Sequence, residues 1–113
     1  MRTEFIATLP HEWLPAAAVF AALGDTARQK ILLLFEPDEE LSIKDIVDVF
    51  PLSRTGIVHH LSVLERAGIL RSRRQGKSAL YCLNAGTVLV ALNALRQYII
   101  EEFPKVREQE GEA

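Results

Sequence analysis

The chain has few of the residues from which disulfide frameworks, metal centres and catalytic sites are built. It contains a single cysteine, Cys82, and three histidines among 113 residues. One cysteine excludes an internal disulfide framework and fits a reducing cytoplasm. No recognisable set of nucleophile, base and orienting group occurs, so we expect neither an enzyme nor a bound cofactor.

Long apolar segments are also missing. No uninterrupted apolar run approaches the roughly 20 residues that a membrane-spanning helix needs, and the first residues, MRTEFIATLPHEW, do not have the pattern of a signal peptide. We therefore expect a cytoplasmic protein with no membrane contact. The hydrophobic fraction of 49% and the charged fraction of 25% are ordinary for a globular domain. The sequence thus predicts one domain over residues 1–113, with an ordered core over about 12–103 and a polar, frayed tail over 104–113.

Charge is unevenly distributed along the chain. The segment from Ser53 to Lys77 carries six cations against one anion, Glu65, so its charge is +5 in a chain whose net charge is -2, and the remainder is -7. Such asymmetry is typical of a nucleic-acid contact. A solvated charged surface, or a basic face that binds an acidic protein partner, would also fit it. The six cations are Arg54, Arg66, Arg71, Arg73, Arg74 and Lys77.

Two helices are expected in the first third of the chain. Pro15 can begin an apolar helix that stops at Gly24, a residue suited to the left-handed position after a helix end. Because this helix has no polar face, it belongs in the core or against a partner subunit. Asp25 can cap a second helix over residues 26 to about 35.

The next two helices are predicted to form a helix-turn-helix. Ser42 and Asp45 have the spacing of a capping pair for a short third helix, which Pro51 ends. Directly afterwards, Ser53 can cap a fourth helix that stops at Gly68 and has apolar residues at helical spacing. The second helix of such a pair can enter a DNA major groove.

A β-hairpin and a long helix complete the expected fold. Residues 69–74 and 78–83 read as two strands around a loop of three to four residues, a candidate wing. The last helix, over 87–103, has an apolar arc wider than one core contact requires. With the first helix it indicates a homodimer interface, unless both helices are buried within one monomer. The predicted class is mainly α with a small β-hairpin: a winged helix-turn-helix of about five helices and a two-stranded wing.

Three motifs together resemble the ArsR/SmtB family of bacterial winged-helix repressors. They are D-x-x-R-x-x-I-L from Asp25, H-L-x-x-L-x-x-A-G-I-L from His60, and R-x-x-G-K-x-x-x-Y from Arg73. The similarity spans roughly residues 16–103. It implies a homodimer that binds a twofold-symmetric operator in double-stranded DNA and is released from it by an effector. An unidentified small molecule, an oxidation at Cys82 and the absence of any effector are the alternatives that the sequence leaves open.

The metal sites of that family are not recognisable in this chain. Where thiolate-sensing members have a Cys-x-Cys pair on the third helix, this sequence reads LSIKDIV, and the last helix contains no histidine. We therefore predict no metal site, because a metal needs several converging ligands. Two alternatives stay open: His11 pairing with a ligand across a dimer, and Cys82 acting as a redox switch instead of a small apolar residue.

The predicted DNA contacts begin in the first turn of the fourth helix. Arg54 has the geometry to bind guanine O6 and N7 as a bidentate donor, with a plain phosphate contact as the alternative. Ser53 and Thr55 can bond phosphate or base edges. Val58, where relatives often carry a hydroxyl residue, can contact a thymine methyl group.

Further contacts are predicted from the two adjacent histidines and from the hairpin. Neighbouring helical residues point about 100° apart. We therefore expect His59 to face the groove, and His60 to lie at the side, either packing or touching phosphate. On the wing, Arg73, Arg74 and Lys77 are predicted to contact the DNA backbone.

Overall fold

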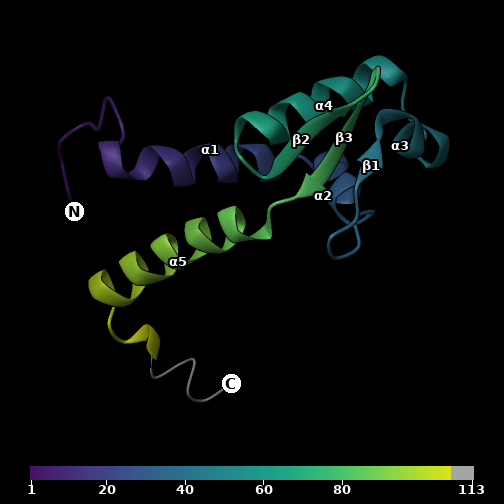
Figure 1. The fold of residues 1–113 in the computed structure, drawn as a ribbon. Helices are drawn as coiled ribbons and strands as arrows, with labels where there is room; N and C mark the ends of the chain where they lie inside the picture. The colour runs from purple at the N-terminus through teal and green to yellow at the C-terminus, as the bar shows by residue number, and fades with distance from the viewer. Residues whose placement is uncertain (108–113) are drawn as a thin grey trace.

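The computed structural model describes residues 1–107, and within them it has the predicted mainly helical architecture with a small sheet (Figure 1). The predicted tail over 104–113 falls partly on residues 108–113, which lie outside the described part. The elements of the fold, in chain order, are the 3-10 turn His11–Trp13 and then α1 (Leu14–Leu23), α2 (Thr26–Leu32), β1 (Leu41–Ser42), α3 (Ile43–Val49), α4 (Arg54–Arg66), β2 (Leu70–Gln75), β3 (Ser78–Leu83) and α5 (Ala85–Glu102).

Three helix starts are capped as the sequence predicts. The Asp25 carboxylate accepts hydrogen bonds from the amides of Ala27 and Arg28 at 2.8 and 3.3 Å. Ser42 and Asp45 form a reciprocal capping box at the start of α3. Ser53 Oγ accepts from the Gly56 amide at the start of α4. These bonds satisfy amides that a helix leaves without partners in its first turn.

The end of α1 differs from the prediction. Gly24 has φ -75°, so the expected left-handed conformation is wrong. The free carbonyls at this helix end are instead bound by side chains of α2: Arg28 Nε donates to the Ala22 carbonyl at 2.6 Å, and Gln29 Nε2 donates to the Leu23 carbonyl at 2.6 Å. Because α2 supplies these donors, a left-handed cap is not required.

The second helix is also shorter than predicted. It ends at Leu32 and not near Phe35. The following amides, of Leu34 and Phe35, bond carbonyls three residues back, those of Ile31 and Leu32. This tighter turn is a common way to finish a helix, and it breaks the α-helical pattern.

The sheet has three antiparallel strands in the order β1-β3-β2. The hairpin β2-β3 is present as predicted, but its turn is tighter, because Gln75 pairs with Ser78 and leaves only Gly76 and Lys77 between the strands. Gly76 has φ +62°, a conformation that glycine adopts without strain. Strand β1, which pairs Leu41 with Tyr81, was not predicted, since two residues are too few to show a period.

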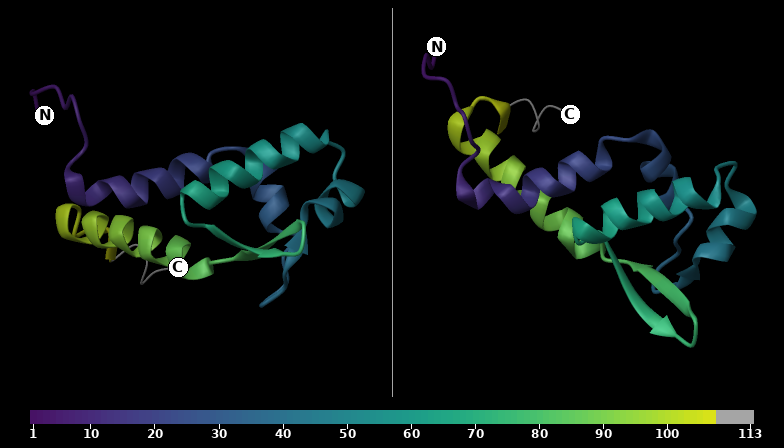
Figure 2. Two further views of the ribbon diagram at one scale, coloured as in Figure 1. Left: turned by 45° about the horizontal axis from the view of Figure 1, so that its top comes forward. Right: turned by 90° about the horizontal axis from the view of Figure 1, so that it is seen from above.

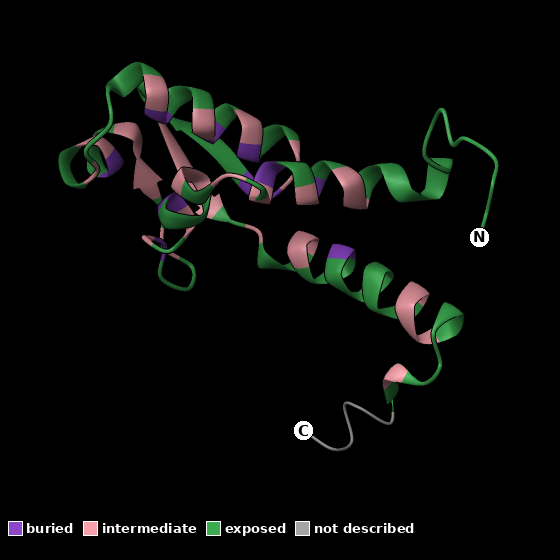
Figure 3. Ribbon diagram, turned by 180° about the vertical axis from the view of Figure 1, so that it is seen from behind, coloured by how far each residue is buried: buried purple, intermediate pink, exposed green. Residues whose placement is uncertain are grey.

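The core lies between α4 and the elements around it. Ile57, Leu61 and Leu64, the apolar residues of α4 at helical spacing, are fully buried, as are Ile31 of α2 and Ile46 of α3. Figure 3 shows this buried side of α4 facing the other elements. The opposite side of α4 is thereby held outward, toward solvent.

Helices α1 and α5 form an arm that extends from this core. They run antiparallel and side by side in both Figure 1 and Figure 2. The radius of gyration is 17.5 Å, against about 13 Å for a compact domain of this size. Helix α5 begins at Ala85 and ends at Glu102, close to the predicted 87–103. Within residues 1–107, no helix is long and apolar enough to cross a membrane.

Candidate nucleic-acid interface

The outward side of α4 carries most of the predicted DNA contacts. Arg54, Thr55, Val58 and His59 are all exposed there, opposite the three buried apolar residues. Val58 differs from the other three because its side chain is apolar and yet 41% of the residue is exposed to solvent. An exposed valine beside a cation and two hydrogen-bonding side chains offers both apolar and polar contacts to base edges.

His60 lies apart from this group, on the side of α4 that faces α2. It is half-buried, and its Nδ1 lies 3.4 Å from Arg28 Nη1. Arg28 also has its Nη1 3.6 Å from the Asp25 carboxylate. The aspartate and arginine of the D-x-x-R motif thus join α1, α2 and α4. His60 has the lateral position that the sequence predicts, in contact with a packing partner.

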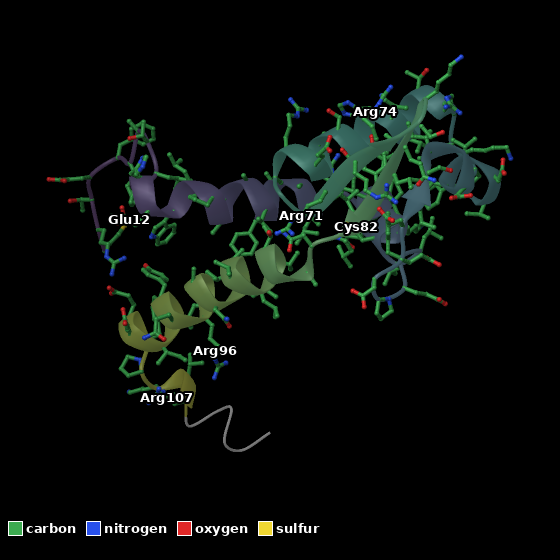
Figure 4. All side chains as sticks on the ribbon, in the orientation of Figure 1. Glu12, Arg71, Arg74, Cys82, Arg96 and Arg107 are labelled. Carbon is green, nitrogen blue, oxygen red and sulfur yellow. The ribbon has the colours of Figure 1, made fainter. Side chains whose placement is uncertain are left out.

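The hairpin presents its cations on two different faces. Ser72 Oγ donates to the Glu65 carboxylate on α4, so the face of β2 that carries Ser72 is turned toward α4. Arg74, two residues on, shares that face because side chains alternate along a strand. Arg71 and Arg73 belong to the opposite face, and Arg71 lies near the first turn of α5 (Figure 4).

Arg73 is held by a carboxylate that the sequence did not indicate. Its Nε and Nη2 donate to the two oxygens of Glu40, at 2.6 and 2.9 Å. The hydrogen bond from Arg73 lowers the pKa of Glu40 below its usual range. Glu40 immediately precedes β1 and is 33 residues away in sequence, so no local pattern signals the pair. A phosphate contact by Arg73 stays a prediction, for which DNA would have to compete with Glu40.

A small polar hollow lies where α3, α4 and the hairpin turn meet. Its volume is about 200 Å³, and its lining includes Lys44, Arg54 and Lys77 from the three elements, together with Ser42 and Ser78. Lys44 was not among the predicted site residues. Its Nζ donates to the Asp48 carboxylate at 2.7 Å across one helical turn, while the lysine side chain stays 78% exposed. The structure therefore brings two predicted contacts, Arg54 and Lys77, together with a third cation.

Metal ligands do not gather in the described part of the chain. Residues 1–107 contain no group of three or more His, Cys, Asp or Glu side chains that could hold a metal ion. The rings of His59 and His60 are 5.7 Å apart and tilted by 52°. Cys82 is half-buried in β3, and His11 is exposed in the 3-10 turn. Metal independence stays a prediction.

Comparison with known proteins identifies the family. A family described as "Helix-turn-helix domain" matches residues 23–73. The transcriptional repressor SdpR of Bacillus subtilis is 32% identical over 81 residues, which cover 72% of this chain and 89% of that protein. The arsenic resistance transcriptional regulator ArsR1 of Pseudomonas putida is 36% identical over 73 residues, covering 65% of this chain and 57% of that protein. The chain belongs to the ArsR/SmtB family.

The fold agrees with that assignment. An ArsR-like transcriptional regulator from Rhodococcus sp. RHA1 superposes with a TM-score of 0.76 at 24% identity, covering 92% of this chain and 97% of that one. The winged helix-turn-helix architecture is therefore confirmed. This ArsR/SmtB protein is a DNA-binding transcriptional regulator and not an enzyme.

Proposed function

We propose that this ArsR/SmtB protein is a homodimeric repressor of a twofold-symmetric operator, with α4 in the major groove of double-stranded DNA and the hairpin beside it on the backbone. The observation that carries the proposal is the exposed face of α4. It presents a cation, a hydroxyl and an apolar side chain in its first two turns, and Lys77 of the hairpin turn lines the same hollow as Arg54. Helix and wing can then bind one duplex together.

The residues of this face have different roles in the proposal. Arg54 reads a guanine edge, and Val58 and His59 contact neighbouring bases. Ser53 and Thr55 bond phosphate or base edges at the start of α4. Base contacts determine which sequence is bound.

The backbone contacts hold the protein on the duplex. In the proposal Arg74 and Lys77 bind phosphates from the hairpin, because within residues 1–107 neither has a carboxylate within ion-pair distance. Phosphate contacts of this kind release counterions and supply affinity for any sequence. His60, in contact with Arg28, supports the orientation of α4 and does not read bases.

The α1–α5 arm supports the homodimer. Of the eighteen residues of α5, all within the described part, only Ala91 is buried. Leu89, Val90 and Leu92 leave 58%, 71% and 47% of their surface exposed, and Figure 3 shows α5 mostly exposed along its length. An exposed apolar arm on so small a protein is unfavourable in water, and pairing with a second copy would cover it.

A two-part experiment tests the proposal. Selection of bound fragments from a genomic library should yield a site with two half-sites about one DNA turn apart, and sedimentation should give the mass of a dimer. Binding should weaken steeply as the salt concentration rises. A protein that sediments as a dimer but selects no duplex, and instead binds an acidic protein through the same face, would refute the DNA role of this face.

A further inference from the structure

We infer that the hollow between α3, α4 and the hairpin turn is the seat of one phosphate of the DNA backbone, held between Lys44 and Lys77. This inference rests on the proposed function and adds to it a contact residue, Lys44. It also gives the hollow a ligand chemistry, that of a phosphodiester.

The seat is built by three elements that meet at the recognition helix. Lys44 lies in the first turn of α3 and Lys77 lies in the hairpin turn, and both residues line the hollow. Arg54, the first residue of α4, also lines the hollow. A ligand in this position would touch the helix-turn-helix and the wing at the same time.

The polar groups around the hollow suit an anion. Three cations line it, and the two nearby carboxylates already have partners: Asp45 accepts from the Ser42 amide at 2.9 Å, and Asp48 accepts from Lys44. Ser42 and Ser78 add hydroxyl groups that can donate. A lysine ammonium is a compact point charge on a flexible stem, and it binds phosphate without the directional demands of a base edge.

A phosphate bound here would also position the wing. Gly76 and Lys77 are the two residues of the hairpin turn between the paired strands, and Lys77 lines this hollow together with residues of α3 and α4. One anion between Lys44 and Lys77 would link the turn to α3. The Arg54 side chain would then keep a fixed position relative to the base edges in the groove.

The seat is tested by the salt dependence of binding to the operator and to random duplex of equal length. Lys77→Ala should flatten the slope of log K against log salt by about 0.9. Lys44→Ala should flatten it by a smaller amount, because Asp48 already neutralises part of the charge of Lys44. Each should weaken operator and random DNA by the same factor, because a phosphate is common to both. Lys30→Ala, which removes an exposed lysine of α2 outside the hollow, is the matched control and should leave the slope unchanged.

A second variant predicts the opposite sign. Asp48→Asn removes the carboxylate that holds Lys44, so the ammonium becomes free for the phosphate. We expect tighter binding to both duplexes in Asp48→Asn and no such gain when Lys44→Ala is added to it. A merely structural role for Lys44 would not produce this gain.

The outcomes separate the seat from the proposed function. If the unmodified protein binds its operator while Lys44→Ala has the same slope as Lys30→Ala, the seat is refuted and the proposed function stands. If the unmodified protein binds no duplex, both are refuted. Circular dichroism of each variant at the assay temperature establishes that a lost contact, and not unfolding, causes the change.

Discussion

Replacing Arg54 with alanine should reduce discrimination between operator and random DNA while the fold stays intact. Arg54 is the first residue of α4, is exposed, and lies at the edge of the hollow shared with Lys77. Alanine is at least as good a helix former as arginine. A cation at a helix N-terminus also opposes the helix dipole, so its removal does not lower the stability of α4.

The magnitude follows from the contact that Arg54 is placed to make. A bidentate pair between arginine and guanine contributes about 1–3 kcal/mol of discrimination. At about 1.4 kcal/mol for each factor of ten, the operator affinity should fall roughly 5- to 150-fold. The affinity for random duplex should fall much less, by the contribution of one diffuse charge.

Competition titrations with labelled operator and unlabelled random duplex measure both affinities at one salt concentration. Arg54→Lys is the control, because it keeps the positive charge and loses the planar fork. It should bind random DNA like the unmodified protein and discriminate almost as poorly as the alanine variant. Equal losses for the two duplexes in Arg54→Ala, with full recovery in Arg54→Lys, would show that Arg54 is only a phosphate contact.

Three further outcomes are expected. Arg74→Ala should flatten the slope of log K against log salt by about 0.9. Arg73→Ala should change this slope less, because Glu40 already neutralises that cation. Equal changes of slope for the two variants in salt titrations would contradict this. Leu92→Glu, at a site 47% exposed in one chain, should give folded monomers with weak operator binding, and a sedimenting dimer would place the interface elsewhere. Zinc, cadmium, arsenite and chelators should leave operator affinity within about threefold, because no converging ligand set is expected; stoichiometric release of DNA by one of these ions would refute that.

Most of the recognition face was predictable because it depends on local spacing. Ser53 caps α4 three residues before the amide that it binds, and the buried residues recur every three or four positions. Once the buried side of α4 is known, the exposure of Arg54 and Val58 follows. Relatives with helix-turn-helix motifs confirm the family but do not test the roles of these side chains.

Contacts between distant segments were not predictable in the same way. Glu40 meets Arg73 and Arg28 meets His60 across more than thirty residues, and β1 exists only because Leu41 reaches the edge of β3. A periodic pattern shows which side of an element is buried but not which residue lies opposite it.

By itself, the sequence determined the type and order of the helices, the N-terminal caps of α2, α3 and α4, and the hairpin, because these depend on hydrogen bonds and apolar spacing within a few residues. Tertiary structure alone decided how the cations are distributed. It paired Arg73 with Glu40 on one face of the hairpin and brought Lys44 and Lys77 to the same hollow at the start of α4. The physical reason is that charge partners are selected by distance in space, which packing sets and local sequence does not.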